Sequence, residues 1–167
     1  DVLSFSTSVD IACGNGAVVY PCNLTGSEAE VYAVSNNAIL AKPRSKTELS
    51  LSPCSLENIP SETRLVLPSP NGSTLSLATG NILTLSGCLR NCKSVADYAN
   101  KNGKRITVIP AGEKWPDGST RFALEDIFGA GAIISRLYGS ISPEAEMAAN
   151  IYHSLHNKET ETLLNCV

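Results

Sequence analysis

The stretch VIPAGEKWPDGSTRFALEDIFGAGAII, residues 108–134, contains a complete strand–loop–helix unit. It begins within the segment KRITVIPAG (104–112), which predicts a buried strand because its centre is continuously apolar. The segment FALEDIFGAGAIISRLYG (122–139) predicts a long helix, in which Gly129 and Gly131 would allow close packing against a sheet. Strands that alternate with helices are the units of parallel sheets. The stretch therefore predicts an α/β fold.

The remainder of the chain repeats this alternation. Strands are expected at residues 17–21, 63–68, 81–87 and 104–112, and helices at residues 6–14, 26–37, 73–80, 91–103, 122–139 and 142–167. The expected helix caps are Ser6 or Thr7, Ser27, and Ser142 followed by Pro143. Residues 41–63 are rich in serine and proline, and predict loops with one short strand at 49–52. Because the strands are apolar without alternation, we expect a three-layer fold, a mostly parallel sheet with helices on both faces.

Length and charge narrow the classes of function. A chain of 167 residues is long enough for one domain with its own core, and a net charge of −3 gives no general attraction to nucleic acid or to an anionic membrane. No apolar run reaches the roughly 18–20 residues of a spanning helix, and no signal peptide is evident, so a cytoplasmic location is expected. The opening DVL reads as the end of a strand, which predicts that residues 1–167 are a fragment of a longer α/β domain, lacking an N-terminal strand and a C-terminal segment.

The six cysteines do not form a recognisable metal or disulfide pattern. They contain no C-x-x-C pair and lie in apolar contexts, so we interpret them as reduced thiols. His153 and His156 fall among polar residues of the last predicted helix, where a solvated face explains them. Neither the cysteines nor the two histidines are therefore candidate catalytic residues.

In parallel α/β sheets, ligands bind beyond the carboxyl ends of the strands, and three segments meet that description. The first is DVLSFSTS, with Asp1 at a strand end and the hydroxyls of Ser4, Ser6, Thr7 and Ser8 at a helix start. Hydroxyls there suit an anion, but serine and threonine are also ordinary helix caps. The second is LPSPNGST, in which Asn71 and Gly72 form either a backbone anion site with Ser73 or a plain turn.

The third segment is the polar loop of residues 113–126. Glu113 directly follows the predicted strand, and Asp117–Gly118 is a turn signal. Arg121 and Glu125 lie at i, i+4 spacing, which favours an ion pair if both are helical. Carboxylates in a first helical turn are also favoured by the helix dipole, which is a structural explanation for Glu125 and Asp126. Glu113 converging with one of that pair would instead make an oxygen-rich Mg²⁺ site.

Together these segments resemble the 2-phosphosulfolactate phosphatase family. The matching pieces are DVLSFSTSVDIACGNGAVVYP, RLVLPSPNGSTLS, GCLRNCKSVADYA and IPAGEKWPDGSTRFALEDIFGAGAII. The resemblance implies an α/β fold and the Mg²⁺-dependent hydrolysis of a phosphate monoester of a small acid. The family reaction converts 2-phosphosulfolactate and water into 3-sulfolactate and phosphate, a step in making coenzyme M.

By position, the resemblance assigns site roles to seven residues: Asp1, Asn71, Gly72, Glu113, Arg121 and the Glu125–Asp126 pair. Two departures bear on the substrate. Many members have an arginine where this chain has Ser4, and the loop between Glu113 and Arg121 is longer here. An arginine is a natural partner for phosphate or sulfonate, and Arg90, at another strand-to-helix junction, is a candidate replacement.

The resulting hypothesis places Mg²⁺ on Asp1, Glu113 and one of Glu125 or Asp126. Arg121 and Arg90 would hold the anionic groups of the substrate, together with backbone N–H groups at Asn71–Ser73. The carboxylate not bound to the metal would act as general acid or base, and Asp1 is either a ligand or a nucleophile. Two other functions stay open. One is binding of an acidic metabolite without turnover, and the other is assembly of a homo-oligomer through the Ala-rich helix SPEAEMAANIY.

Overall fold

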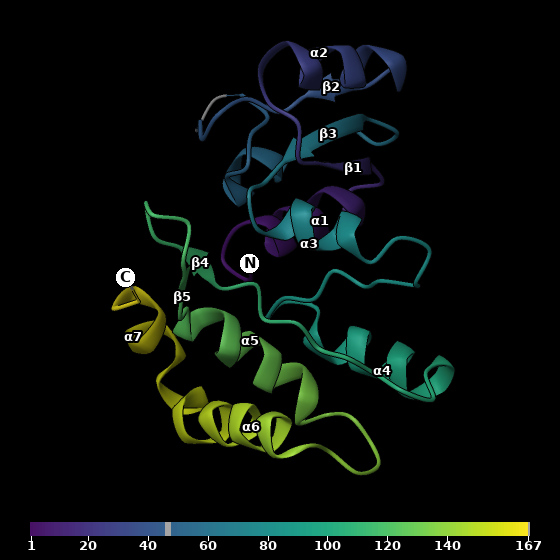
Figure 1. Cartoon of the computed structure of the whole chain (residues 1–167). Helices are drawn as coiled ribbons and strands as arrows, with labels where there is room; N and C mark the ends of the chain where they lie inside the picture. Colours follow the sequence, from purple (N-terminus) through teal and green to yellow (C-terminus); the bar gives the residue numbers. More distant parts are fainter. Residues whose placement is uncertain (46–47, 167) are drawn as a thin grey trace. The chain divides into compact units, whose positions relative to one another are not determined.

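The computed structural model describes residues 1–45 and 48–166. The chain divides into two compact units, and the elements of both are labelled in Figure 1. One unit is Ser4–Ser86, and the other joins Asp1–Leu3 to the chain from Gly87 onward. No described helix has the length and apolar character needed to cross a membrane.

The unit Ser4–Ser86 is built on a parallel sheet of three strands in the order β1-β3-β2. The strands are β1 (Val18–Cys22), β2 (Ile39–Leu40) and β3 (Arg64–Pro68). The helices are α1 (Phe5–Gly14), α2 (Gly26–Ser35), the 3₁₀ turn η1 (Pro53–Leu56) and α3 (Gly72–Ala78). The central strand β3 pairs in parallel with both of its neighbours, with Leu65 opposite Val19 and Ile39. The α/β class and the parallel sheet are thus confirmed in this unit.

The central strand explains why the sequence RLVLP is apolar without alternation. Leu65, Val66 and Leu67 are all fully buried, although successive side chains of a strand point to opposite faces. Leu65 and Leu67 pack in a cluster with Phe5 and Ala12 of α1, whereas Val66 packs with Ala29 and Ala33 of α2. Helices therefore cover both faces of the sheet in this unit (Figure 1). With only three parallel strands described, a three-layer arrangement of the whole chain stays a prediction.

The second unit is mainly helical. It contains α4 (Cys92–Asn102), α5 (Leu124–Ile134), α6 (Pro143–Leu155), the 3₁₀ turn η2 (His156–Lys158) and α7 (Glu159–Leu164), and a hairpin of β4 (Glu113–Lys114) and β5 (Thr120–Arg121). Helix α5 is buried from Phe128 to Ile134. It packs against α6, as Figure 1 shows. The predicted cap of α6 is confirmed, because the Ser142 hydroxyl accepts a hydrogen bond from the Ala145 N–H and Pro143 is the first helical residue.

The glycines of α5 serve close packing, but the partner differs from the prediction. A Cβ at Gly129 would lie 2.7 Å from Cγ2 of Val2, and a Cβ at Gly131 would collide with the carbonyl group of Ala148 in α6. Both contacts lie within this unit, which has no parallel sheet among its described residues. Small residues in α5 thus allow a helix and the N-terminal segment, not a sheet, to approach its backbone.

Several predicted elements are absent or shorter. No strand forms at 81–87, at 104–112 or at 49–52, where a single parallel bridge joins Lys42 to Ser50. Within 104–112, Val108 packs on the α4–α5 core, but Ile109 is 55% exposed. An apolar pattern specifies burial of one face, whereas a strand also needs a neighbouring backbone to pair with, and none is described here.

The observed helix ends also differ from the predicted ones. Helix α1 starts one residue before the predicted Ser6 cap, and α2 starts at Gly26, before Ser27. The helix predicted over 122–139 covers only Leu124–Ile134, and the predicted last helix is interrupted at η2.

We predict that Gly131→Ala destabilises the protein although alanine is the better helix former. The collision with the Ala148 carbonyl should lower the free energy of unfolding by about 1–3 kcal/mol, which exceeds the roughly 1 kcal/mol gained in helix propensity. Urea denaturation of the whole chain measures the change. Gly14→Ala is the matched control, because a Cβ at helical Gly14 meets no atom within 4 Å and stability should stay equal or rise slightly. Equal stability of wild type and Gly131→Ala would contradict this packing.

Candidate active site

The buried carboxylate of Asp126 is the centre of the candidate site. Asp126 lies in the first turn of α5 and is only 5% exposed. Its Oδ1 forms an ion pair with the terminal ammonium nitrogen of Asp1, at 2.8 Å, and accepts a hydrogen bond from the Val2 N–H, at 2.7 Å. Its Oδ2 accepts a hydrogen bond from the Gly112 N–H, at 2.8 Å. Asp126 therefore connects two segments that are separated by more than a hundred residues of sequence.

These bonds bring two predicted metal ligands into one neighbourhood. Asp1 supplies one of the bound nitrogens, and Glu113 directly follows Gly112. Gly112 has φ of +68°, a left-handed conformation that favours glycine, and the chain passes from there into the β4–β5 hairpin. Asp1, Glu113 and Asp126 thus belong to one compact unit, in which their backbones are held together.

The hairpin places Arg121 beside Glu113. These two residues are directly opposite each other in the antiparallel β4–β5 pair, so their side chains lie on the same face. Trp115 lies on that face too, and the Arg121 guanidinium carbon is 5.7 Å from the centre of its ring, a cation–π contact. Arg121 is therefore positioned by a carboxylate neighbour and an aromatic ring. The expected i, i+4 pairing with Glu125 does not apply, because Arg121 is in β5 and α5 begins at Leu124.

The predicted turn at Asp117–Gly118 closes this hairpin. Gly118 has φ of +84° and its N–H donates to the Trp115 carbonyl. The hydroxyl and the N–H of Ser119 both donate to Asp117, and these hydrogen bonds hold the pKa of the exposed Asp117 carboxyl below its usual value. Asp117 is thus occupied in turn formation.

Glu125 lies in a different environment from Asp126, its neighbour in α5. Its side chain is half-buried and approaches the thiol of Cys166, beyond α7. Burial raises the pKa of the Cys166 thiol, and the nearby Glu125 carboxylate adds to the rise. Glu125 and Asp126 therefore face different surroundings, as expected for adjacent positions about 100° apart on a helix.

Several other predicted residues belong to the unit Ser4–Ser86. Ser4 is the buried N-cap residue of α1, and its hydroxyl contacts the Leu51 carbonyl and accepts a hydrogen bond from Arg44 at 2.8 Å. Arg44 is thus the arginine that contacts Ser4 in this unit. The sequence offered no signal for this contact, because Arg44 lies forty residues from Ser4 along the chain.

The Asn71–Gly72–Ser73 turn has strong packing roles. The Gly72 N–H donates to the Ser69 hydroxyl at 3.0 Å, and the buried Ser73 hydroxyl donates to the Leu67 carbonyl at 2.7 Å. A Cβ at Gly72 would collide with the ring of Phe5 in α1. This turn therefore holds α3 against α1 and the end of β3.

Arg90 and the histidines have surface positions. Arg90 is exposed just before α4, in the same unit as Arg121. The rings of His153 and His156 are exposed and contact Tyr152, whose hydroxyl accepts a hydrogen bond from Arg136.

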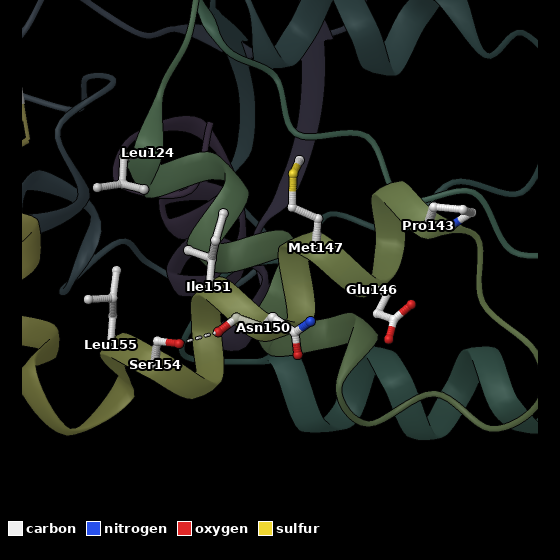
Figure 2. Close-up of a pocket in the computed structure, with 8 residues that line it drawn as sticks. All are labelled: Leu124, Pro143, Glu146, Met147, Asn150, Ile151, Ser154 and Leu155. Carbon is white, nitrogen blue, oxygen red and sulfur yellow. Dashed lines mark hydrogen bonds between the residues drawn. The ribbon is translucent and has the colours of Figure 1, made fainter.

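All six cysteines are free thiols, as predicted. Figure 2 shows an open groove along α6, lined by Leu124, Pro143, Glu146, Met147, Asn150, Ile151, Ser154 and Leu155, which contains none of the predicted site residues.

The acidic residues of this neighbourhood are too few to enclose a metal ion with protein ligands alone. Within residues 1–45 and 48–166, no group of three or more His, Cys, Asp or Glu side chains is arranged to hold a metal. Mg²⁺, however, is commonly bound through one or two carboxylates, several waters and substrate phosphate oxygens. Asp1 and Glu113, whose backbones are both held by Asp126, are the acidic residues that such a site would use.

Comparison with known proteins gives the family. The sequence profile of 2-phosphosulpholactate phosphatase matches residues 26–166. A curated protein of Carboxydothermus hydrogenoformans, named probable 2-phosphosulfolactate phosphatase, is 31% identical over 144 residues, which are 82% of this chain. The match spans 58% of the length of that relative. On this evidence the chain belongs to the 2-phosphosulfolactate phosphatase family.

Proposed function

We propose that this chain provides the catalytic residues of a Mg²⁺-dependent hydrolase of phosphate monoesters. The supporting observation is the Asp126 carboxylate, which holds the Asp1 and Gly112–Glu113 backbones together at a hairpin that also presents Arg121. The name of the Carboxydothermus relative supports 2-phosphosulfolactate as the substrate, with 3-sulfolactate and phosphate as products. Roles in coenzyme M synthesis and in the cytoplasm, and a three-layer fold of the whole domain, belong to the same proposal.

In this proposal Asp1 and Glu113 hold the metal. A bound Mg²⁺ would neutralise phosphoryl charge and favour attack by water. Asp1 is largely buried, with a side chain 10% exposed, so its carboxylate is restrained by its surroundings. Glu113 is restrained by pairing of β4 with β5. Restraint of both ligands reduces the entropy lost when they bind an ion.

Arg121 is proposed to bind the anionic substrate. A guanidinium donates paired hydrogen bonds to phosphate or sulfonate oxygens, and the ring of Trp115 can support its orientation. Ser4, Asn71, Gly72, Ser73 and Arg90 remain proposed substrate contacts.

Hydrolysis also needs proton transfers. Water attacks phosphorus, the bond between phosphorus and the ester oxygen breaks, and a carboxylate takes the proton that water loses. The leaving oxygen of the acid receives a proton in turn. We propose Glu125 for this exchange because it is half-buried at the first turn of α5, whereas the oxygens of Asp126 are engaged by backbone nitrogens. A nucleophilic role of Asp1 is the alternative, and trapping of a phosphorylated chain would reveal it.

Replacing Glu113 should test the proposed activity. Glu113→Gln removes a metal ligand and should lower Mg²⁺-dependent kcat/KM for 2-phosphosulfolactate or an aryl phosphate by about 100-fold or more, since metal ions supply several kcal/mol of charge stabilisation. Steady-state release of phosphate measures the effect. Glu30→Gln, at an exposed position of α2, is the control and should match wild type. Binding of the substrate without turnover by the wild-type chain would instead favour a metabolite-binding function.

Trp115 offers a direct readout of anion binding. It is the single tryptophan of the chain and lies under the Arg121 guanidinium. In the presence of Mg²⁺, phosphate that binds to Arg121 should change the charge beside the Trp115 ring and produce a saturable change in tryptophan emission. Arg121→Gln should abolish the change, whereas Arg64→Gln, which removes a similar cation–π contact with Tyr20, should retain it. An undiminished response of Arg121→Gln would refute anion binding at Arg121.

A further inference from the structure

We infer that Asp126 is a positioning residue that fixes the spacing of Asp1 and Glu113, and is not itself a ligand of the metal. The inference rests on the proposed function, because it concerns how that metal site is organised. In the hypothesis drawn from the sequence, Asp126 was instead a candidate for the third metal ligand.

The hydrogen bonds of Asp126 account for both of its carboxylate oxygens. Oδ1 accepts from the nitrogens of Asp1 and Val2, and Oδ2 accepts from the Gly112 nitrogen. Main-chain donors to a charged acceptor form strong hydrogen bonds, and a buried N–H that lost its acceptor would be costly. A metal that took an oxygen of Asp126 would compete with these bonds. We therefore expect Asp126 to keep its hydrogen bonds to the backbone when the metal binds.

The same bonds set a distance. Two nitrogens that bind opposite oxygens of one carboxylate lie at most about 8 Å apart, given the measured bond lengths. The nitrogen of Val2 is attached to Asp1, and the nitrogen of Gly112 belongs to the residue before Glu113. Asp126 thus keeps the backbones of the two proposed ligands close together, through main-chain atoms alone.

A second contact holds the N-terminal segment against α5. Val2 is 4% exposed and packs directly on Gly129, one turn after Asp126 in α5. A Cβ at Gly129 would approach Val2 Cγ2 to 2.7 Å, so Gly129→Ala must displace Val2. Since Asp1 precedes Val2, this substitution shifts Asp1 without altering any charge.

The experiment combines hydrogen exchange with Mg²⁺ binding on the full chain. Exchange of the Gly112 and Val2 amides is measured by NMR with and without saturating Mg²⁺, and Mg²⁺ affinity is measured by calorimetry. We expect both amides to be protected in the absence of Mg²⁺ and to stay protected when it binds. Asp126→Asn should expose the Gly112 amide and weaken Mg²⁺ binding by about 10–100-fold, as loss of supporting contacts does at other metal sites. Asp97→Asn, at an exposed position of α4, should change neither quantity.

Other results would overturn the inference or the proposed function. Loss of Gly112 protection when Mg²⁺ binds would make Asp126 a ligand and overturn the inference. Unchanged Mg²⁺ affinity in Asp126→Asn would also overturn it. If that variant fails to fold, Gly129→Ala serves instead, and it should weaken Mg²⁺ binding while keeping Gly112 protected; wild-type affinity would count against positioning. A wild-type chain that binds no Mg²⁺ refutes the proposed function itself, a result distinct from the others.

Discussion

The buried carboxylate of Asp126 is the constraint on which the second unit depends. A carboxylate that is 5% exposed is tolerated only when its oxygens have strong polar partners, and here these are two main-chain N–H groups and the terminal ammonium nitrogen of Asp1. The position of Asp126 in the first turn of α5 adds a favourable interaction with the helix dipole. Electrostatics at this helix end therefore determines where the N-terminal segment and the β4–β5 hairpin lie.

Packing along α5 makes that arrangement possible. Gly129 accommodates Val2 on one side, and Gly131 accommodates the backbone of α6 on another. Alanine at either site would separate α5 from a partner, so the poor helix propensity of glycine is offset by close contact. The buried carboxylate and the glycines belong to the same eleven-residue helix, which links the stability of the unit to the geometry of its candidate site.

The sequence allowed prediction of elements whose signals are local. The apolar run Leu65–Leu67 correctly indicated a strand buried on both faces, and Ser142–Pro143 correctly indicated a helix start. The strand expected at 104–112 did not form, because pairing depends on a second backbone that no local pattern specifies. The roles of the acidic residues Asp1, Glu113, Glu125 and Asp126 stay predictions. That Asp126 binds backbone nitrogens while Glu125 approaches Cys166 was not predictable, since it depends on contacts distant in sequence.

Charge balance gives an independent reason to keep Asp126 off the metal. Two carboxylates neutralise one Mg²⁺, so the pair Asp1 and Glu113 would leave the ion able to attract a phosphate dianion, with Arg121 adding a positive charge nearby. A third coordinated carboxylate would make the centre anionic and would repel the substrate. By accepting main-chain hydrogen bonds, the Asp126 carboxylate has its charge stabilised by peptide dipoles instead. The same side chain can then organise an acidic site without adding its charge to the coordination sphere.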